Sequence, residues 1–220
     1  IQKITTQKKP KYVVVCFDSK EKSFRHKIFP EYKSNRQAPP EDLITQIPLV
    51  QQLIETLQIP FVIKPGLEAD DLIGSLAKKG ENQGWTIYLY SSDKDLCQLV
   101  TPCCFLLQPH KDYHIIDRKE VEKLYGVTPE QIEDFLAITG DTSDNIPGIK
   151  GLGPQTAALL LQKWGTLENI YLSLDQISSP KQKALLLEHK DEAFMSKKLA
   201  TIDSALPIEA SIEDFALSSQ

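Results

Sequence analysis

Short apolar runs alternate with helical patterns over the first half of the chain. Residues 12–17, 59–63 and 85–90 are continuous β-branched and aromatic runs, which are typical of buried parallel strands. Residues 41–57, and then a stretch from 72 to about 80, repeat apolar side chains at helical spacing. Strands that alternate with helices in this way predict an α/β fold with a parallel sheet.

Beyond about residue 117 the pattern becomes entirely helical. Two short runs before this point, residues 104–107 and 113–116, are typical of paired strands. After it, the glycine-rich residues 148–153 separate two helical patterns. We therefore expect an α/β core over residues 1–140, a helical subdomain over residues 141–205, and a tail or linker to further domains over residues 206–220.

The overall composition bounds the functions that the chain can have. Its 220 residues suffice for one large domain or two small ones, and its net charge of -5 by itself argues against nucleic-acid binding. The four cysteines form no C-x-x-C pair, so zinc is not expected, and reduced thiols in a cytoplasmic protein account for them. No stretch is long enough to span a membrane, and no signal peptide is visible. Because the chain begins with Ile1, we expect a fragment of something longer.

Acidic residues gather where the predicted strands end. In an open parallel sheet, functional groups collect at the carboxyl ends of the strands. Carboxylates packed together repel one another and take up protons unless a cation lies among them, although each acid alone could cap a helix or form a turn. Eight carboxylates are candidates for one site: Asp18, Glu68, Asp70, Asp71, Asp93, Asp95, Asp141 and Asp144.

The candidate ligands are all oxygen donors, which suit Mg²⁺ or Mn²⁺, and their number suggests two metal positions. Two ions can activate a water and stabilise the leaving oxygen of a phosphodiester. When the eight acids are set aside, the rest of the chain is mildly basic. The acidic average therefore no longer excludes nucleic acid as a partner.

Residues 19–40 form a basic segment that interrupts the alternation. Aromatic residues lie between its basic ones, its periodicity is weak, and it ends in Pro39-Pro40. Lysine binds phosphate as a point charge and arginine binds it through two donors, so both can offset charge at phosphorus. A solvated basic loop is the alternative interpretation. The basic side chains are Lys20, Lys22, Arg25, His26, Lys27, Lys33 and Arg36.

Seven short motifs occur in the order and spacing of one known family. They are Phe17-Asp18, Phe24-Arg25, Tyr32-Lys33-Ser34-Asn35-Arg36, Gly66-Leu67-Glu68-Ala69-Asp70-Asp71, Ser92-Asp93-Lys94-Asp95, Gly140-Asp141-Thr142-Ser143-Asp144-Asn145-Ile146-Pro147-Gly148, and Gly151-Leu152-Gly153 with Thr156-Ala157. From about residue 12 to residue 202, the chain resembles the 5′-nuclease (5′→3′ exonuclease) domain of bacterial DNA polymerase I, which is related to phage 5′ nucleases and flap endonucleases. The resemblance implies a mainly parallel central sheet flanked by helices, followed by an all-helical, helix–hairpin–helix-like subdomain.

The resemblance also implies a role for each of the eight carboxylates. In that family the acids at the strand ends hold two or three divalent ions, and we expect two Mg²⁺ or Mn²⁺ ions here. Glu68, Asp70, Asp71 and Asp93 would lie nearest the first metal, and Asp95, Asp141 and Asp144 would lie toward the second, with Asp18 between them.

The DNA contacts implied by the resemblance fall in two places. The basic segment matches the helical arch or clamp through which a single-stranded 5′ end passes, where Lys33 would reach the scissile phosphate and Arg25 and Arg36 would make further phosphate contacts. Backbone N–H groups of a glycine-rich turn can cradle a phosphate of duplex DNA, and a K⁺ ion often sits in this turn in the family. A plain helical hairpin is the alternative interpretation. The candidate DNA-binding residues of the turn are Gly148, Lys150, Gly151, Gly153 and Thr156.

The implied function is structure-specific cleavage of 5′ ends and flaps of DNA by two-metal-ion phosphodiester hydrolysis. It would serve primer removal and repair within a bacterial, nucleoid-associated DNA polymerase I. Partners would be 5′-flap, nicked or branched duplex DNA and covalently linked polymerase domains. Two departures from the family stand out: we expect its first strand, which ends in a further metal-binding Asp, to be absent ahead of Tyr12, and Ser91-Ser92-Asp93 stands where Thr-Gly-Asp is common.

Two other classes of function fit part of the pattern. With the first Asp absent, the chain would bind branched DNA without cutting it. Alternatively, it would be a metal-dependent phosphatase or a Mg²⁺-binding signalling domain on a similar sheet, which needs neither a basic arch nor a helical hairpin. Cleavage of a 5′-flap duplex in Mg²⁺ separates the nuclease from the binding module.

Overall fold

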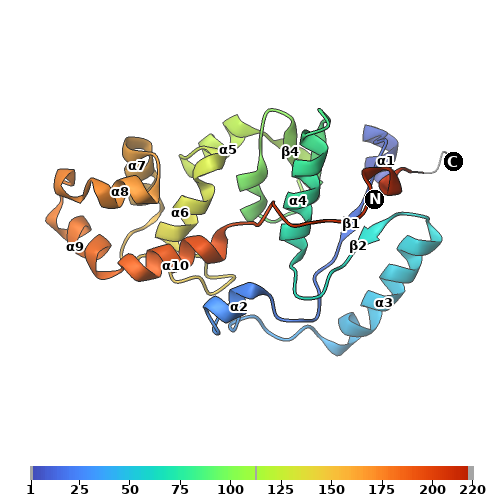
Figure 1. The fold of residues 1–220 in the computed structure, drawn as a ribbon, viewed down its shortest axis with the longest axis horizontal. Helices are drawn as coiled ribbons and strands as arrows, with labels where there is room; N and C mark the ends of the chain where they lie inside the picture. Colours follow the sequence, from blue (N-terminus) through green and yellow to red (C-terminus); the bar gives the residue numbers. More distant parts are fainter. Residues whose placement is uncertain (1, 112, 218–220) are drawn as a thin grey trace.

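The computed structural model describes residues 2–111 and 113–217, and an α/β part and a helical part lie side by side in it (Figure 1). No described helix is long and apolar enough to cross a bilayer. The α/β part contains α1 (Gln2–Lys8), β1 (Val15–Cys16), α2 (Phe24–Ile28), α3 (Glu41–Thr56), β2 (Phe61–Val62), α4 (Ala69–Glu81), β3 (Ile87–Tyr90), the 3₁₀ helix η1 (Asp95–Leu99), β4 (Cys104–Gln108), β5 (His114–Ile116) and α5 (Arg118–Tyr125). The remaining elements are η2 (Pro129–Gln131), α6 (Ile132–Thr139), α7 (Pro154–Trp164), α8 (Leu167–Leu172), η3 (Leu174–Gln176), α9 (Pro180–Glu188), α10 (Lys190–Ala200) and η4 (Ile212–Phe215).

The strands form two small sheets in the part of the chain that is described. β1 pairs with β2 in parallel, with Val15 opposite Phe61. β3 pairs with β4 in parallel, with Ile87 opposite Cys104, and β5 runs antiparallel to β4. The predicted, mainly parallel α/β fold is therefore confirmed. The two sheets share no described hydrogen-bonded strand pair, and α4 joins them by packing against both β1 and β3.

Helix α4 begins earlier than its apolar pattern predicts. The pattern starts at Leu72, whereas the helix starts at Ala69, whose N–H donates to Asp18 Oδ1 at 2.9 Å. Asp70 and Asp71 therefore occupy the first turn, where the partial positive charge of a helix N-terminus favours acids. Leu72 behind them is fully buried and anchors this turn to the core. The earlier start places both aspartates at the strand ends.

One apolar core extends from the three-stranded sheet into the helical part. Leu106 on β4, Ile138 on α6 and Leu161 on α7 are all fully buried, and each such side chain contributes about 1.5–3 kcal/mol through removal from water. Helix α6 packs against both α7 and α10. The loop after α6, which carries Asp141 and Asp144, is therefore held in place relative to the sheet.

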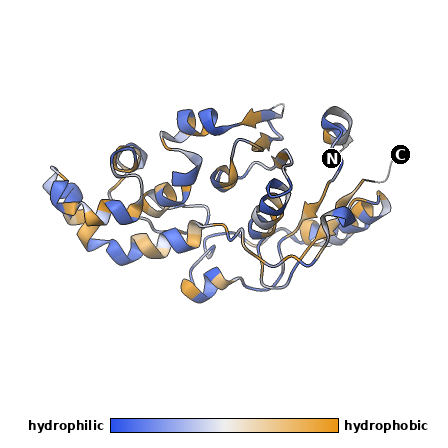
Figure 2. Cartoon of the chain, turned by 45° about the horizontal axis from the view of Figure 1, so that its top comes forward, coloured by the Kyte–Doolittle hydropathy of each residue, from blue (hydrophilic) through white to orange (hydrophobic). Residues whose placement is uncertain are grey.

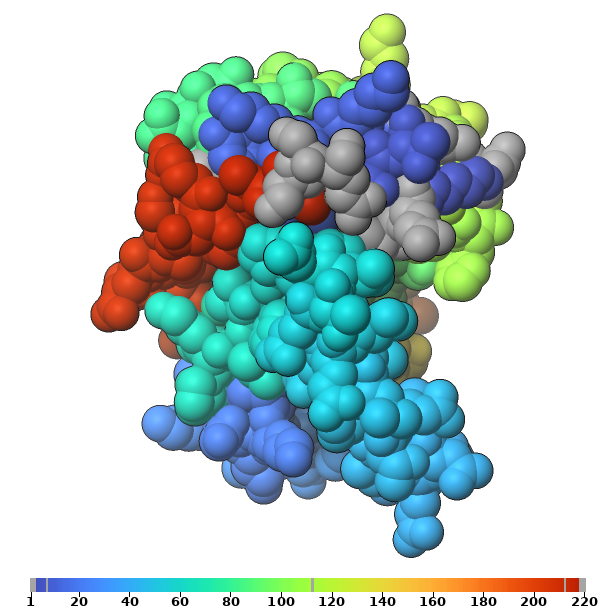
Figure 3. Space-filling view, turned by 90° about the vertical axis from the view of Figure 1, so that its right-hand side faces the viewer, coloured from blue at the N-terminus to red at the C-terminus, as the bar shows by residue number. Residues whose placement is uncertain are grey.

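The apolar stripe on α3 is exposed. The helix forms over nearly the predicted range with Pro48 inside it, but Ile54 is its one buried residue, and Leu53 beside it is 57% exposed. Figure 2 shows hydrophobic colour along this helix, and Figure 3 shows α3 projecting from one face of the molecule. The periodicity predicts the helix correctly, but the tertiary contacts in this structure leave most of its stripe uncovered.

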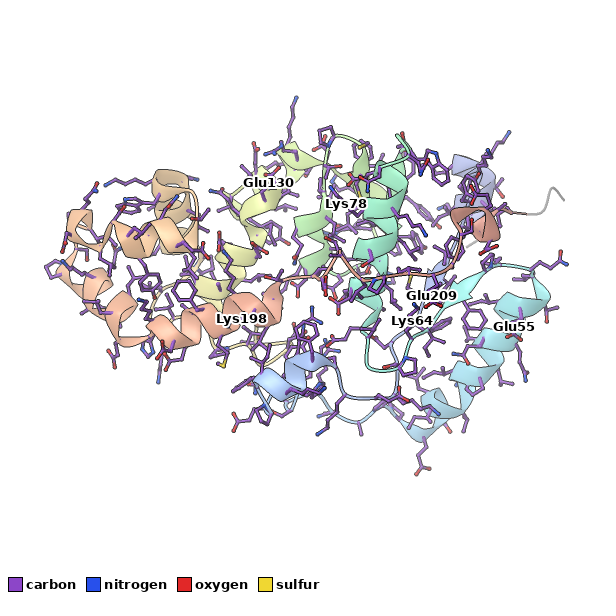
Figure 4. The ribbon with its side chains drawn as sticks, viewed as in Figure 1. Glu55, Lys64, Lys78, Glu130, Lys198 and Glu209 are labelled. Atoms are coloured by element: carbon purple, nitrogen blue, oxygen red, sulfur yellow. The ribbon has the colours of Figure 1, made fainter. Side chains whose placement is uncertain are left out.

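The chain after α10 returns along α4 toward the first strand (Figure 1). Lys64 Nζ, which lies beside Glu209 in Figure 4, donates to the carbonyl oxygen of Pro207 at 3.1 Å. Farther on, the Val13 N–H donates to the carbonyl oxygen of Phe215 at 2.9 Å. As far as residue 217, the segment predicted as a tail thus lies against the α/β part.

Candidate metal and nucleic-acid site

Asp70 lies close to acids from two other strand ends. Burial, and then the negative charges of Asp93 and Asp18, raise the pKa of Asp70 to about 7. A carboxyl group among other carboxylates and away from water holds its proton more tightly. The structure therefore brings the acids that follow β1, β2 and β3 together.

Asp95 connects this group to the loop after α6. Burial, and then Asp93 and Asp141, raise the pKa of Asp95 to about 7, and Asp144 adds a smaller contribution. Asp95 Oδ1 is buried and has no hydrogen-bond partner among the described residues. Such an oxygen is costly unless a cation or an ordered water contacts it. We use the name acid edge for the connected set Asp18, Glu68, Asp70, Asp93, Asp95, Asp141 and Asp144.

The basic segment closes over the acid edge. Lys33 Nζ lies 2.5 Å from Glu68 Oε2 and 3.6 Å from Asp144 Oδ2. The hydroxyl of Tyr32 lies 3.1 Å and 3.0 Å from the same two oxygens. Burial works to raise the pKa of Glu68, but the charge of Arg25 and the hydrogen bond from Lys33 lower it to about 2. Glu68 thus stays ionised at neutral pH and holds Lys33 over the edge.

Two residues with positive φ angles lock this turn against the loop after α6. Lys33 has a φ of 58° and Asn145 a φ of 57°. The Lys33 N–H donates to the carbonyl oxygen of Asp144 at 2.9 Å, and Asn145 Nδ2 donates to Glu31 O at 2.8 Å and Ser34 Oγ at 3.1 Å. Asparagine tolerates this left-handed conformation better than most residues. Asn145 is a site residue outside the set of candidates predicted from the sequence, although its place in the Gly140–Gly148 motif was a signal.

Two half-exposed cations pair with the outer acids. Arg36 Nη2 contacts Asp144 Oδ1, and the arginine side chain is 51% exposed. Lys94 Nζ lies 3.0 Å from Asp141 Oδ2. Burial works to raise the pKa of Asp141, but hydrogen bonds from Ser143 and then Lys94 lower it. Lys94 is a second residue that the candidate set omitted, and its place between two acids in the Ser92–Asp95 motif was the available signal.

Arg25 and Asp71 form a buried pair beside these contacts. Arg25 is only 3% exposed, and its two terminal nitrogens donate to the two oxygens of Asp71 at 2.7 Å and 2.8 Å. Asp71 is fully buried. The structure therefore places Asp71 next to the acid edge in the chain but pairs it with a protein cation.

The acid edge has the chemistry that a hard divalent ion requires. Its donors are all carboxylate oxygens, and the raised pKa values of Asp70 and Asp95 show that its negative charges lack full compensation. Within the described residues, no three metal-binding side chains lie close enough to share one ion. The donor set therefore fits Mg²⁺ or Mn²⁺, but it is an open edge and not a closed cage.

The glycine-rich turn between α6 and α7 is tightly built. Gly148 has a φ of +63°, and a Cβ atom on it would lie 2.2 Å from Gly140 N, so only glycine fits there. The Gly148 N–H donates to Ser196 Oγ at 3.0 Å. Gly153 is the N-cap of α7. Of the candidate DNA-binding residues in the turn, Lys150, Gly151 and Gly153 are exposed, Thr156 is half-buried and Gly148 is buried.

The carboxylates of the acid edge suit a divalent ion, and Lys33 above them suits a phosphate. The family model of the 5′-3′ exonuclease N-terminal, resolvase-like domain matches residues 1–126, and that of the 5′-3′ exonuclease C-terminal SAM fold matches residues 127–220. The chain therefore belongs to the 5′-3′ exonuclease family. The family resemblance that the sequence motifs predicted is confirmed.

Curated relatives show the same kinship. DNA polymerase I of Bacillus caldotenax is 40% identical over 219 residues, which are 98% of this chain and 25% of that protein. A 5′-3′ exonuclease of Aquifex aeolicus is 38% identical over 211 residues, which are 96% of this chain and 71% of that protein. The chain thus spans about a quarter of the length of its DNA polymerase I relatives.

Solved structures show the same fold. The T5 5′-exonuclease with bound divalent metal ions (zinc) has a TM-score of 0.75 and 22% identity, covering 92% of this chain and 79% of that one. A T5 D15 flap endonuclease in a pseudo-enzyme-product complex with DNA and metal ions has a TM-score of 0.76 and 23% identity, covering 93% and 78%. At these identities the likeness concerns the fold alone.

Proposed function

We propose that this chain is a structure-specific 5′ nuclease that cleaves 5′ ends and flaps of DNA by two-metal-ion phosphodiester hydrolysis. The observation that carries the proposal is the acid edge, on which the pKa values of Asp70 and Asp95 are raised to about 7 and over which Lys33 lies. Carboxylates packed in this way become stable anions when a cation joins them. Membership of the 5′-3′ exonuclease family supports the same activity.

The acid edge would hold two Mg²⁺ or Mn²⁺ ions. When bound, these ions would activate water for attack on a phosphodiester and offset the charge on the leaving oxygen. Asp71 would reach an ion only if its pair with Arg25 opened, because both of its oxygens already accept hydrogen bonds from that arginine. The first ion would be held by Glu68, Asp70 and Asp93, and the second by Asp95, Asp141 and Asp144, with Asp18 between them.

The basic segment would orient the 5′ end of the DNA. Lys33 would exchange its contact with Glu68 for the scissile phosphate, because the ammonium group is a mobile point charge that rotates among acceptors. Arg36, which is half exposed, would bind a neighbouring phosphate through its planar fork. Both side chains lie on the turn over the acid edge, so a phosphate held by them would face the metal ligands.

The glycine-rich turn would hold the duplex. Exposed N–H groups near Gly151 and Gly153, at the start of α7, offer donors to a phosphate, with Lys150 as an additional cation. Gly148 would act by shaping the turn, because its own N–H is already bonded. Thr156 would complete the contact, and K⁺ could occupy the turn.

The cellular role would be primer removal and repair in the bacterial nucleoid. The DNA polymerase I relatives, of which this chain matches about a quarter, support a nuclease that works next to covalently linked polymerase domains.

Cleavage of an end-labelled 5′-flap duplex tests the proposal. We expect cleavage at the branch in Mg²⁺ and none in EDTA, and we expect Asp95→Asn to abolish cleavage while flap affinity stays within about twofold. The matched control is Asp175→Asn, a carboxylate whose side chain is 99% exposed, which should leave both unchanged. Undiminished cleavage by Asp95→Asn would contradict the site assignment.

A module that binds branched DNA without cutting it is the second candidate. It is favoured by one observation, that no three metal-binding side chains in the described ranges converge on a single point. The same assay decides, because flap binding by the unmodified chain without product in either Mg²⁺ or Mn²⁺ would establish the module.

A further inference from the structure

Arg25 lies at a buried junction of three segments: α2, the first turn of α4, and the backbone at the C-terminal end of α10. We propose that Arg25 is a positioning residue, whose guanidinium holds Asp71 and the carbonyls at the end of α10 in place and makes no contact with DNA phosphate. Its expected effect on cleavage rests on the proposed nuclease function, whereas its contacts do not. We use the name Arg25 junction for Arg25, Asp71 and the backbone of residues 199–203.

Four of the five N–H donors of Arg25 donate to protein acceptors, and the fifth, on Nη1, has the ion-paired Glu68 as its neighbour. A guanidinium has five such donors. Nε donates to the carbonyl oxygen of Leu199 at 2.8 Å, and Nη2 donates to Thr201 O at 2.8 Å and to Asp71 Oδ1 at 2.8 Å. Nη1 donates to Asp71 Oδ2 at 2.7 Å and lies 3.4 Å from Glu68 Oε1. At 3% exposure, the guanidinium cannot reach a phosphate at the surface without breaking these bonds.

Both carboxylate oxygens of Asp71 also have hydrogen-bond partners within the protein. Besides the two bonds from Arg25, Asp71 Oδ1 accepts the Asp203 N–H at 2.9 Å. Because Asp71 is in the first turn of α4, these bonds set the position of the turn in which Asp70 is the preceding residue. A planar arginine fork facing both carboxylate oxygens defines an orientation, which a single ammonium group cannot do. The Arg25 junction therefore aligns one part of the acid edge.

The Arg25 junction also lies at the C-terminal end of α10. Lys198, labelled in Figure 4, marks the last turn of this helix, and Leu199 follows it. Carbonyl groups at a helix C-terminus lack partners within the helix and favour a nearby cation. Helix α10 packs against α6, and the loop after α6 carries Asp141 and Asp144. Arg25 thus ties the basic segment to both sides of the acid edge.

Variants at Arg25 and Arg36 distinguish positioning from phosphate contact. We expect Arg25→Gln to lower kcat on a 5′ flap by about tenfold to a hundredfold, as loss of a supporting partner does. The salt dependence of flap binding in EDTA should stay unchanged. Arg25→Lys should fail to restore kcat, because it keeps the charge and loses the fork. Arg36→Gln is the matched control. It should reduce the salt slope, which is the steepness of log affinity against log salt concentration, by about one.

Amide hydrogen exchange of the metal-free chain gives a readout that does not depend on activity. We expect faster exchange of the Asp203 N–H by about tenfold or more in Arg25→Gln and Arg25→Lys, and no change in Arg36→Gln. If no form of the chain cleaved DNA, the proposed function would fail, whereas this exchange and the salt slope would still decide the role of Arg25.

Two results would overturn the proposal. One is that Arg25→Lys restores both kcat and affinity. The other is that Arg25→Gln lowers the salt slope by about one while the Asp203 N–H stays protected. Should the variants fail to fold, phenylglyoxal labelling of the unmodified chain decides: Arg36 should react and be protected by flap DNA, and Arg25 should stay unlabelled. Labelling of Arg25 that DNA prevents would contradict the proposal.

Discussion

The Arg25 junction and the acid edge meet at two adjacent residues and solve the same electrostatic problem in opposite ways. In the junction, Asp71 is fully buried, and Arg25 and a backbone N–H compensate its charge. In the edge, Asp70 has no comparable cation, and its neighbours Asp93 and Asp18 help to raise its pKa to about 7. Asp71 is fully buried and Asp70 is partly buried.

The difference separates a structural carboxylate from a candidate ligand. A buried acid with a fixed partner keeps one protonation state and one position. A buried acid among other acids changes its proton affinity and accepts whatever cation arrives. We therefore expect substitutions in the junction to act on folding and alignment, and substitutions in the edge to act on metal binding and chemistry.

The largest expected effect is on stability. Asp71→Ala should lower the free energy of unfolding by about 3–5 kcal/mol, because it leaves the Arg25 charge buried without its partner. Asp70→Ala, the matched control one residue away, should not lower it in the metal-free chain, because the Asp70 charge has no fixed partner there. Urea unfolding in EDTA measures both. Equal destabilisation by the two variants would show that Asp71 is no more structural than Asp70, and would contradict the comparison between the two regions.

The next effect is on cleavage. Asp93→Asn should lower kcat on a 5′-flap duplex by at least about a hundredfold, which corresponds to about 2.7 kcal/mol, because it removes an acid shared by the surroundings of Asp70 and Asp95. Single-turnover cleavage in Mg²⁺ measures the loss, and fluorescence anisotropy should show nearly unchanged flap affinity. A hundredfold loss of affinity instead would mean that Asp93 supports DNA binding.

A smaller effect concerns pH. Folding raises the pKa values of Asp70 and Asp95 from 3.8 to about 7, so between these values the folded, metal-free chain binds more protons than the unfolded chain. The contribution of these groups to stability is therefore fully present below about pH 4 and is lost as the pH rises toward 7. We expect each of the two groups to contribute a loss on the order of 2 kcal/mol between pH 5 and pH 7.

Urea unfolding at several pH values in EDTA measures how steeply the free energy of unfolding falls with pH. The variant Asp70→Asn combined with Asp95→Asn should flatten it, because neither amide titrates in this range. Saturating Mg²⁺ should also flatten it. A slope that the double variant leaves unchanged would assign the pH dependence to other groups.

The smallest effect belongs to the exposed cations. Arg36→Gln should weaken flap binding about fivefold, or about 1 kcal/mol, because its pair with Asp144 lies at the surface and its phosphate contact would be one of several. Titrations at two salt concentrations measure the affinity and its slope. If the salt dependence of binding were unaltered, Arg36 would pair with Asp144 and would make no phosphate contact.

Much of the candidate site could be predicted from the sequence, because parallel strands carry their C-terminal residues to one edge. The strand-end acids Asp18, Asp70, Asp93 and Asp95 meet in the structure as this rule predicts. Periodicity also located α3 and α4 within a few residues. The start of α4 was harder to predict from the sequence, because the Asp18 side chain that caps it comes from a distant part of the chain.

Sequence patterns could not predict which basic side chain pairs with which acidic one. Nothing local distinguishes Asp70 from Asp71, and Arg25 resembles any other arginine of a basic segment. The pairing of Arg25 with Asp71 depends on carbonyl groups 174 and 176 residues farther along the chain. Lys94 and Asn145 belong to motifs that the sequence showed, but the residues that they pair with lie in other loops.

The amino-acid sequence by itself determined the helices, the strands, the family and the set of acids available to the site. Those properties depend on periodicity and on short motifs, which act over a few neighbouring residues. Only the tertiary structure decided which acids face one another without a cation and which one Arg25 neutralises. Burial and charge compensation depend on what packs around a side chain, and at Asp70 and Asp71 one residue of helical rotation leads to two different surroundings.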